Sequence, residues 1–249
     1  MEPVKVTGMV LSVMPVGEND RRLVLLTAER GKIHGFARGA RRPRSSLTAA
    51  AQPFVYGEFM VYEGRNAYTF ASARVLEYFD SLRGDVEAVC CGSYFLELAD
   101  YFARENEEDS LMLRLLLAAV KALCRGAVPK RIIRAAFEIK MLQVNGIAPE
   151  SFACAVCGSR ENLTVFSASH HGMLCREHAP QAGLSGVAFE GAAVYTFQYV
   201  LSHPPEQIFS FNLTDRVYRQ VSSALDHYFH QVIDRHFKSL EMLEAMYGQ

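Results

Sequence analysis

Hydrophobic and polar positions alternate along the first eighty residues. The apolar runs are rich in Val, Tyr, Phe and Thr, which is the pattern of half-buried β-strands. Gly, Pro, Asn and Asp separate these runs at residues 15–20, 29–31 and 63–66, as in tight turns. The pattern therefore predicts five strands, at residues 4–14, 22–28, 32–38, 54–62 and 67–78.

One long connection, between the third and fourth strands, interrupts an otherwise compact series of strands and turns. Five short strands with one long connection favour a small closed barrel over a sandwich. An oligonucleotide-binding (OB) barrel has that number of strands. We therefore expect an OB-fold, nucleic-acid-binding domain at residues 1–80.

After Asp80 the apolar positions recur every three or four residues, which indicates helices. Ser110 is the expected N-cap of the second helix, and Pro129 precedes the third. In the last helix the apolar stripe, which ends at Val232 and Phe237, is typical of a core face and not of a cofactor site. The predicted helices cover residues 85–102, 110–124, 130–145, 189–201 and 214–243.

The charge is unevenly distributed over the 249 residues. Residues 1–50 hold nine Lys/Arg and four Asp/Glu, a net +5, so the remainder carries −6 while the whole chain carries −1. A polyanion would be attracted to the front of the chain and not to the whole surface. Half of the residues are hydrophobic and 21% are charged, as in an ordinary soluble globular protein.

The long connection is the most basic part of the chain. Residues 31–54, GKIHGFARGARRPRSSLTAAAQPF, contain five cations and no carboxylate. We interpret the segment as a cationic loop that holds a polyanion. A solvated basic loop without a partner is an equally weighted alternative. The five cations are Lys32, Arg38, Arg41, Arg42 and Arg44.

Three cysteines and a histidine have a metal-binding spacing. Cys154 and Cys157 form a Cys-x-x-Cys pair, and Cys175 and His178 follow after 17 intervening residues. Two such pairs, each spanning a tight turn, can bring four ligands to one tetrahedron. Gly158 and Gly172 stand where the turns need them.

Two alternatives to this metal site remain open. His170 or His171 could replace His178, and the thiols could be unrelated pairs with an incidental histidine. Four protein ligands would leave no position for water, so the metal would be structural Zn²⁺.

The complete prediction is an α+β chain: the OB barrel, then an all-α domain at residues 81–249 with a zinc knuckle inserted at about 150–180. Cys90, Cys91 and Cys124 are expected to be small core residues.

The sequence shows no catalytic constellation. A zinc nucleobase deaminase would need His-x-Glu before Pro-Cys-x-x-Cys, whereas no His-x-Glu occurs and Ala153 precedes the first cysteine. The signatures of zinc peptidases, phosphate loops, dinucleotide-binding folds and nucleophile elbows are also absent from the sequence. We therefore predict a protein that is not an enzyme and has no catalytic residues.

These residues together resemble the bacterial recombination mediator family RecO. The first turn, residues 15–20, the pair Gly31-Lys32 and the basic connection 37–54 are similar to the family's front domain. Phe137 and Glu138, with Leu142 and Gly146, match the helix before the Cys-x-x-Cys of zinc-bearing members. His178 stands where many zinc-bearing relatives would be expected to show a fourth cysteine.

The resemblance implies a protein of DNA repair and recombination. Such a protein binds single- and double-stranded DNA, anneals complementary strands, and works with RecR to load RecA on DNA covered by single-strand-binding protein (SSB). Basic side chains that contact successive phosphates would give sequence-independent binding. The DNA-binding residues expected here are Lys5, Arg21, Arg22, Lys32, Arg38, Arg41, Arg42 and Arg44.

The third helix offers a second possible site. It combines cations with apolar residues, a mixture suited to an acidic peptide that ends in an apolar side chain. In RecO-like proteins the acidic tail of SSB binds the helical domain, which implies a tail-binding site at Lys130, Arg131, Arg134 and Phe137, with Lys140 nearby. The alternative is that Phe137 belongs to the core and the cations are solvated.

Neither a secretory signal nor a membrane span is predicted. The chain starts without a basic and then apolar leader, and the segment 111–124 is too short and is interrupted by Arg114 and Lys121. We expect a cytoplasmic, nucleoid-associated protein without a membrane partner.

Two other functions remain as alternatives: a zinc-dependent nucleic-acid-processing enzyme, and an RNA-binding or transcription-associated OB module.

Overall fold

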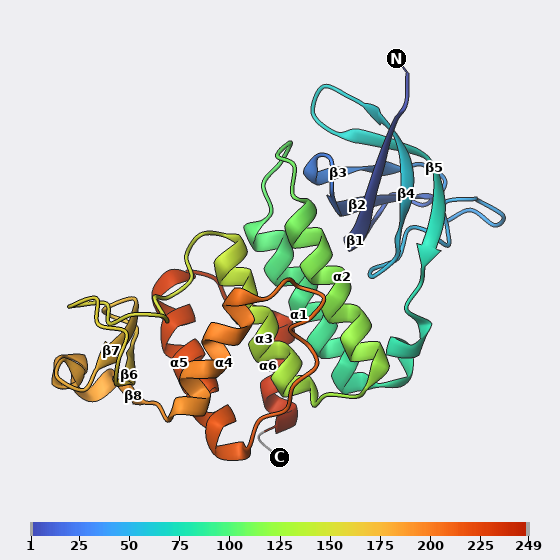
Figure 1. The fold of residues 1–249 in the computed structure, drawn as a ribbon. Coiled ribbons are helices and arrows are strands. Elements are labelled where there is room, and N and C mark those ends of the chain that lie inside the picture. The colour runs from blue at the N-terminus through green and yellow to red at the C-terminus, as the bar shows by residue number, and fades with distance from the viewer. Residues whose placement is uncertain (1, 248–249) are drawn as a thin grey trace. The chain divides into compact units, whose positions relative to one another are not determined.

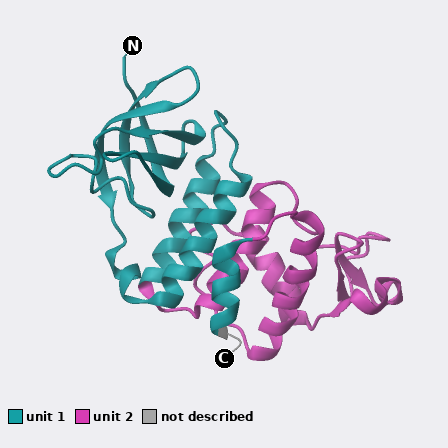
Figure 2. Ribbon diagram, turned by 180° about the vertical axis from the view of Figure 1, so that it is seen from behind, with its two compact units in different colours: residues 1–124, 237–249 teal, residues 125–236 magenta. Residues whose placement is uncertain are grey.

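The computed structural model describes residues 2–247, which form two compact units. Unit 1 contains the chain up to Cys124 and again from Phe237, and unit 2 contains Arg125–His236 (Figure 2). The helices α1, α2 and α6 are therefore grouped with the barrel. These units are groups of residues in spatial contact and do not define domains of the chain. The division into domains at residues 1–80 and 81–249 therefore stays a prediction.

The first five strands of unit 1 form a closed barrel (Figure 1). Strand β2 pairs with both β1 and β3 in antiparallel fashion, β4 pairs with both β1 and β5, and a short parallel pairing of β3 with β5 closes the barrel. This architecture confirms the α+β class and the OB-like barrel. The strands are β1 (Val4–Val16), β2 (Asp20–Thr27), β3 (Gly31–Ala37), β4 (Tyr56–Glu63) and β5 (Tyr68–Glu77).

The barrel interior is filled by the alternate apolar side chains of its strands. In β3, for example, Ile33 and Ala37 are buried while Lys32 and His34 point outward and are half-exposed. Phe59 and Phe70 meet edge to face inside, with ring centroids 6.0 Å apart, a favoured aromatic geometry. The period of two in the sequence thus gives each strand one apolar face, which is buried inside the barrel.

Three helices complete unit 1: α1 (Val86–Phe102), α2 (Ser110–Arg125) and α6 (Lys238–Tyr247), with the 3-10 helix Asp80–Gly84 ahead of α1. The Asp85 side chain accepts a hydrogen bond from the Ala88 amide and so caps α1. Asp109 does the same for the Met112 amide of α2. The N-cap of α2 is therefore Asp109 and not Ser110, which already lies within the helix.

Unit 2 consists of three helices and a small sheet. Its helices are α3 (Lys130–Val144), α4 (Gly191–Ser202) and α5 (Asp215–Val232). Between α3 and α4 the cysteine segment forms the antiparallel sheet β7-β6-β8, which the sequence pattern did not reveal. Its strands are β6 (Leu163–Ser167), β7 (Gly172–Cys175) and β8 (Val187–Ala188), and the 3-10 helix Ala179–Ser185 precedes β8.

The single last helix predicted at residues 214–243 is wrong. The structure ends α5 at Val232 and begins α6 at Lys238, with Ile233 in an extended conformation. The five-residue step from Val232 to Phe237 does not fit one helical stripe. Phe237 instead packs edge to face on Tyr94 and Tyr101 of α1, at centroid distances of 5.6 and 5.9 Å.

Gly31 allows the chain between α1 and α2 to approach the barrel. It has a φ of +54°, and a Cβ there would collide with the carbonyl oxygens of Arg104 and Glu107. Next to it, the Lys32 amide donates a hydrogen bond of 2.8 Å to the Arg104 carbonyl. A residue without a side chain is therefore required at this turn.

We predict that Gly31→Ala lowers the free energy of unfolding by roughly 2 kcal/mol or more, because it adds a steric collision to left-handed backbone strain. Urea unfolding followed by circular dichroism measures the change. Gly84→Ala is the matched control, since nothing lies within 4 Å of its Cβ position. Equal stability of the two variants would contradict this account of the turn.

Candidate nucleic-acid interface and metal centre

The connection between β3 and β4 is folded onto the barrel and is not a free loop. Leu47, Ala50 and Ala51 are at most 5% exposed and belong to the barrel core. The amide of Gly39 donates to Asp20 Oδ1 over 2.7 Å, and the amide of Arg41 donates to the Asn19 carbonyl over 2.9 Å. The connection is thus tied to both the barrel interior and the β1–β2 turn.

This anchoring leaves the basic side chains of the connection on the outside. Within residues 2–247 none of the arginine side chains of residues 38–44, nor that of the nearby Arg22, forms an ion pair with a carboxylate. Arg41 donates only to a neutral group, the Gly17 carbonyl, over 3.0 Å. Uncompensated cations therefore gather around the β1–β2 turn. The exposed set is Arg22, Arg38, Arg41, Arg42 and Arg44.

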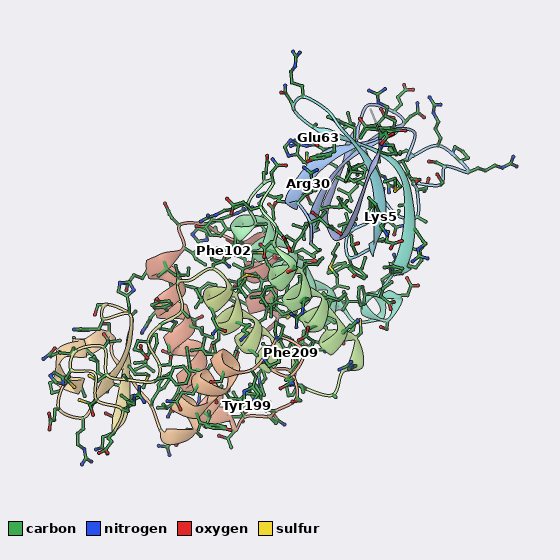
Figure 3. All side chains as sticks on the ribbon, turned by 45° about the horizontal axis from the view of Figure 1, so that its top comes forward. Lys5, Arg30, Glu63, Phe102, Tyr199 and Phe209 are labelled. Atoms are coloured by element: carbon green, nitrogen blue, oxygen red, sulfur yellow. The ribbon has the colours of Figure 1, made fainter. Side chains whose placement is uncertain are left out.

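Three of the predicted DNA-binding cations, Lys5, Arg21 and Lys32, have partners within the protein. Lys5 is paired with Glu58 over 3.2 Å, and the Arg21 guanidinium donates to the Ala51 carbonyl. The hydrogen bond from Lys5, aided by the charges of Lys5 and Arg74, lowers the pKa of the Glu58 carboxyl although partial burial opposes this. Figure 3 shows Lys5 on the barrel.

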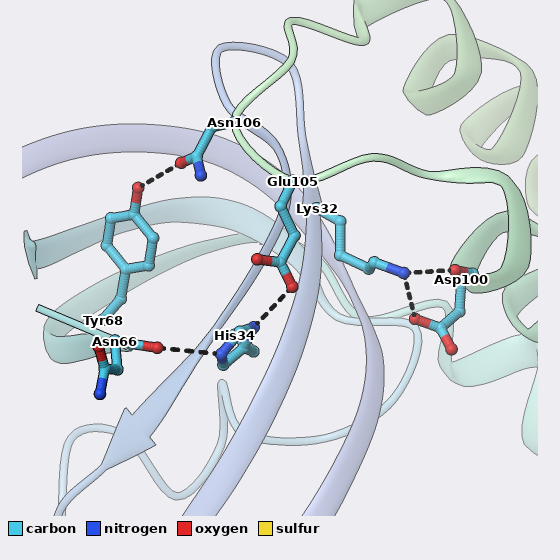
Figure 4. A network of polar contacts seen from close by, with 7 residues as sticks. All are labelled: Lys32, His34, Asn66, Tyr68, Asp100, Glu105 and Asn106. Atoms are coloured by element: carbon cyan, nitrogen blue, oxygen red, sulfur yellow. Dashed lines mark hydrogen bonds and ion pairs between the residues drawn. The ribbon is translucent and has the colours of Figure 1, made fainter. Parts of the chain in front are cut away.

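Lys32 is held by the helical part of unit 1 in this structure. Its Nζ donates to the Asp100 carbonyl over 2.7 Å and lies 3.5 Å from the Asp100 carboxylate (Figure 4). The side chain is only 23% exposed. Its charge lies at the C-terminal end of α1, where a cation is favourable, and its predicted contact with phosphate stays a prediction.

A polar network beside Lys32 joins the barrel to the chain that follows α1. His34 lies between two acceptors, Glu105 Oε1 at 3.1 Å and the Asn66 carbonyl at 3.2 Å, and the Tyr68 hydroxyl is 3.1 Å from Asn106 Oδ1 (Figure 4). These residues border a cavity of about 230 Å³. The network supports the barrel on the side of α1.

Two further exposed side chains of the barrel were not among the predicted site residues. Phe36 stands on the outward face of β3, in phase with Lys32 and His34, and Arg65 lies exposed in the β4–β5 hairpin. The sequence did contain a signal for Phe36. Alternation places Ile33 and Ala37 on the inward face of β3, so the aromatic Phe36 must lie on the outward face.

The metal-binding set predicted from the cysteine spacing is brought together in unit 2. The ligand atoms of Cys154, Cys157, Cys175 and His178 all lie within 4.8 Å of one another. Cys175 Sγ and His178 Nδ1, for example, are 3.2 Å apart. This group could hold a metal ion, and three thiols with one imidazole form a donor set that suits zinc.

Tight turns position the four ligands. Gly158 has a φ of +75°, and its amide donates to the Cys154 carbonyl, which closes the first knuckle. Cys175 ends β7, and the His178 amide donates to its carbonyl in the second. A Cβ on Gly172 would collide with the backbone of Glu150. The turn role predicted for Gly158 is confirmed, whereas Gly172 lies in β7 and is needed for the close approach to Glu150.

Backbone amides favour the thiolate forms of two ligands. For Cys154, burial alone would raise the pKa, but the amides of Cys157, Cys175 and Val156 outweigh it and the pKa is lowered. The His178 amide is the main cause of the lowered pKa of Cys175. Such outer hydrogen bonds orient metal ligands, and a lowered pKa makes the metal-binding thiolate available.

The alternative histidines lie outside this group. His170 Nδ1 is 2.9 Å from the Ser167 hydroxyl, and His171 Nε2 is 3.2 Å from the side-chain amide of Gln231. The His171 ring also packs edge to face against Tyr228. The geometry therefore selects His178 as the fourth ligand.

The residues predicted to bind the SSB tail do not form one exposed site. Phe137 is fully buried, and Arg134 forms a buried ion pair of 2.8 Å with Glu138. Lys140 is also buried, and it donates to the carbonyls of Val200, Leu201 and His203 at the end of α4. These three side chains are therefore not exposed to a peptide in this structure, and the burial of Phe137 agrees with the alternative of a core residue.

Only the start of α3 keeps accessible cations of this set. Lys130 and Arg131 are half-exposed. Arg131 donates to Asp215 Oδ1 over 2.6 Å, and its guanidinium lies 4.9 Å from the centre of the Tyr218 ring.

Among the described helices, none is long and apolar enough to cross a membrane.

Comparison with known proteins gives a consistent result over nearly the whole chain. The family model described as recombination protein O N terminal matches residues 1–79, and the one described as recombination protein O C terminal matches residues 83–241. A protein named DNA repair protein RecO from Alkaliphilus metalliredigens is 30% identical over 98% of this chain and 99% of its own. The protein of that name from Anaeromyxobacter sp. is 39% identical over 72% of each chain.

The barrel with a helical part and a Cys₃His group thus falls in a class of recombination and repair proteins. The chain belongs to the RecO family.

We predict that the purified protein carries one metal ion per chain and that Cys175→Ser loses it, because a tetrahedral site needs all four ligands. Elemental mass spectrometry measures the ion. His170→Ala is the matched control and should keep full occupancy. Loss of metal from His170→Ala, with retention in His178→Ala, would contradict the assignment of the fourth ligand.

Proposed function

We propose that this protein is a non-catalytic DNA-binding mediator of repair and recombination. It binds single- and double-stranded DNA through the barrel, anneals complementary strands, and with RecR helps to load RecA on SSB-coated single strands. Membership of the RecO family supports the role in DNA repair. The finer activities follow from the resemblance and from the charge of the barrel.

One observation carries the proposal: the arginines Arg22, Arg38, Arg41, Arg42 and Arg44 are exposed and form no ion pair with a carboxylate in the described chain. Phosphates can bind such cations and release condensed counterions, and this binding does not depend on sequence. The paired cations Lys5, Arg21 and Lys32 would contribute less, because a ligand must first replace their partners.

Annealing follows if two strands are held by their backbones. Arginine contacts with phosphates leave the base edges free, so that complementary bases can pair while both strands are bound. A cationic surface also offsets the repulsion between the two strands. The mechanism requires no chemical step, which agrees with a protein that is not an enzyme.

The Cys₃His group is proposed to bind structural Zn²⁺. With Cys154, Cys157, Cys175 and His178 as ligands no coordination position remains for water, so the ion would perform no reaction. It would join the knuckle at the start of the segment to the end of β7, which stabilises a small sheet that has few core residues of its own.

Partner binding is assigned to the helical part on the basis of the resemblance. RecR and the SSB tail are the proposed direct partners, and RecA is an indirect one. For an acidic tail, the accessible cations of α3 are Lys130 and Arg131. Arg134 and Phe137 would act only as support for the helix, because both are buried.

We predict that the triple charge reversal Arg38→Glu, Arg41→Glu and Arg42→Glu lowers affinity for single- and double-stranded DNA at least about 100-fold at low salt, since each lost phosphate contact weakens binding. Annealing of SSB-coated complementary oligonucleotides should slow in parallel. Fluorescence anisotropy measures binding, and energy transfer between labelled strands measures annealing.

The matched control for this variant is Lys121→Glu, Arg125→Glu and Arg219→Glu, which changes the net charge equally at exposed helical positions. It should bind and anneal nearly as the natural protein does. If both triple variants lost affinity to the same extent, binding would depend on net charge alone and the barrel would not be the DNA site.

A further inference from the structure

We propose that Phe36, with Arg22 beside it and Met14 on the far side of Arg22, is a stacking platform for unpaired nucleobases on the outer face of the barrel. The platform deepens the proposed DNA binding and rests on it. It adds a preference for single strands, because a base inside a duplex is stacked on its neighbours and cannot reach the ring.

Strand register places these side chains in one row across the sheet. Arg22 of β2 lies opposite Met14 of β1 and opposite Phe36 of β3. The row continues through the pairing of Phe36 with Thr69 in β5 and of Thr69 with Tyr62 in β4. Neighbouring strands lie about 4.8 Å apart, so Met14 and Phe36 are positioned on either side of Arg22.

The members of the row point outward. The residues next to Phe36 in β3, Gly35 and Ala37, are buried, and so is Leu23 next to Arg22. Met14 is 59% exposed, Phe36 37% and Tyr62 38%. Single exposed apolar side chains are common on proteins, but Met14, Arg22 and Phe36 stand on three neighbouring strands and so lie side by side, whereas Tyr62 lies two strands further round the barrel.

The other end of the same face is already covered. Leu26 of β2 is buried although it has the outward phase of Arg22, and Lys32 of β3 is bound to Asp100 of α1. The face is therefore closed by the helical part of unit 1 at one end and open at the end where the basic connection begins. Arg38 follows Phe36 by two residues, so the open end is continuous with the uncompensated arginines.

The charge beside the row argues for a nucleic acid strand as its occupant. Arg22 and Arg38 are exposed and form no ion pair within residues 2–247, so phosphates can bind beside Phe36 while a base stacks on its ring. Base–aromatic stacking contributes about 1–3 kcal/mol per base and does not depend on sequence. A flanking guanidinium adds cation–π attraction to the stack.

The test compares Phe36→Leu with the natural protein on three ligands: a thymidine oligonucleotide, an abasic strand of equal length, and a duplex. Leucine keeps an apolar side chain but removes the aromatic face. We expect about a 5- to 150-fold loss of affinity for the thymidine strand, the range that corresponds to 1–3 kcal/mol. Affinities for the abasic strand and the duplex should stay unchanged.

Phe36→Trp gives a second readout, because the chain contains no tryptophan. The fluorescence of this variant should be quenched by the thymidine strand and not by the abasic strand, and its affinity should match that of the natural protein. Tyr195→Leu and Tyr195→Trp are the matched controls at a 64% exposed aromatic of α4, and they should respond to neither strand.

The outcomes separate this inference from the proposed function. Unchanged thymidine binding by Phe36→Leu, with normal DNA binding by the natural protein, would overturn the platform alone. Equal losses on all three ligands, or indole fluorescence of Phe36→Trp that does not respond to the thymidine strand, would also overturn it. Failure of the natural protein to bind any of the ligands would overturn the proposed function together with the platform.

Discussion

The attachment of the basic connection to the barrel is the interaction on which the cationic surface depends. Leu47, Ala50 and Ala51 fill the barrel core, while the Gly39 amide is held by Asp20. The backbone is thereby fixed without the use of any arginine side chain of the connection, except for the neutral contact of Arg41 with Gly17. The arginines of the connection therefore lie close together and are not neutralised by carboxylates, as binding to phosphates requires.

Tertiary structure divides the front cations into two groups with different roles. Lys5 and Lys32 are balanced by Glu58 and Asp100, so they contribute to packing between strands or between the barrel and α1. The arginines near the β1–β2 turn lack such carboxylate partners within residues 2–247. In unit 2 the buried cations Arg134 and Lys140 are likewise satisfied, by Glu138 and by the end of α4, as buried charges must be.

Local patterns in the sequence were sufficient to predict much of the architecture. The five strands, the first three helices and the four clustered metal ligands follow from alternation, helical period and cysteine spacing, which are properties of short segments. Long-range pairing was not predictable in this way. Asp100 neutralises Lys32 from 68 residues away, and Phe237 lies outside the stripe of α5 and packs on Tyr94 and Tyr101. The row at Phe36 depends on cross-strand register, which no single segment contains.

The salt dependence of binding by the natural protein tests the central claim most directly. The association constant for a single-stranded oligonucleotide would be measured between low and physiological salt. Contacts of about five arginines with phosphates predict that the logarithm of this constant falls against the logarithm of salt concentration with a slope of about −3 to −4. A slope near zero would show that the arginines do not bind phosphates, and would contradict the account.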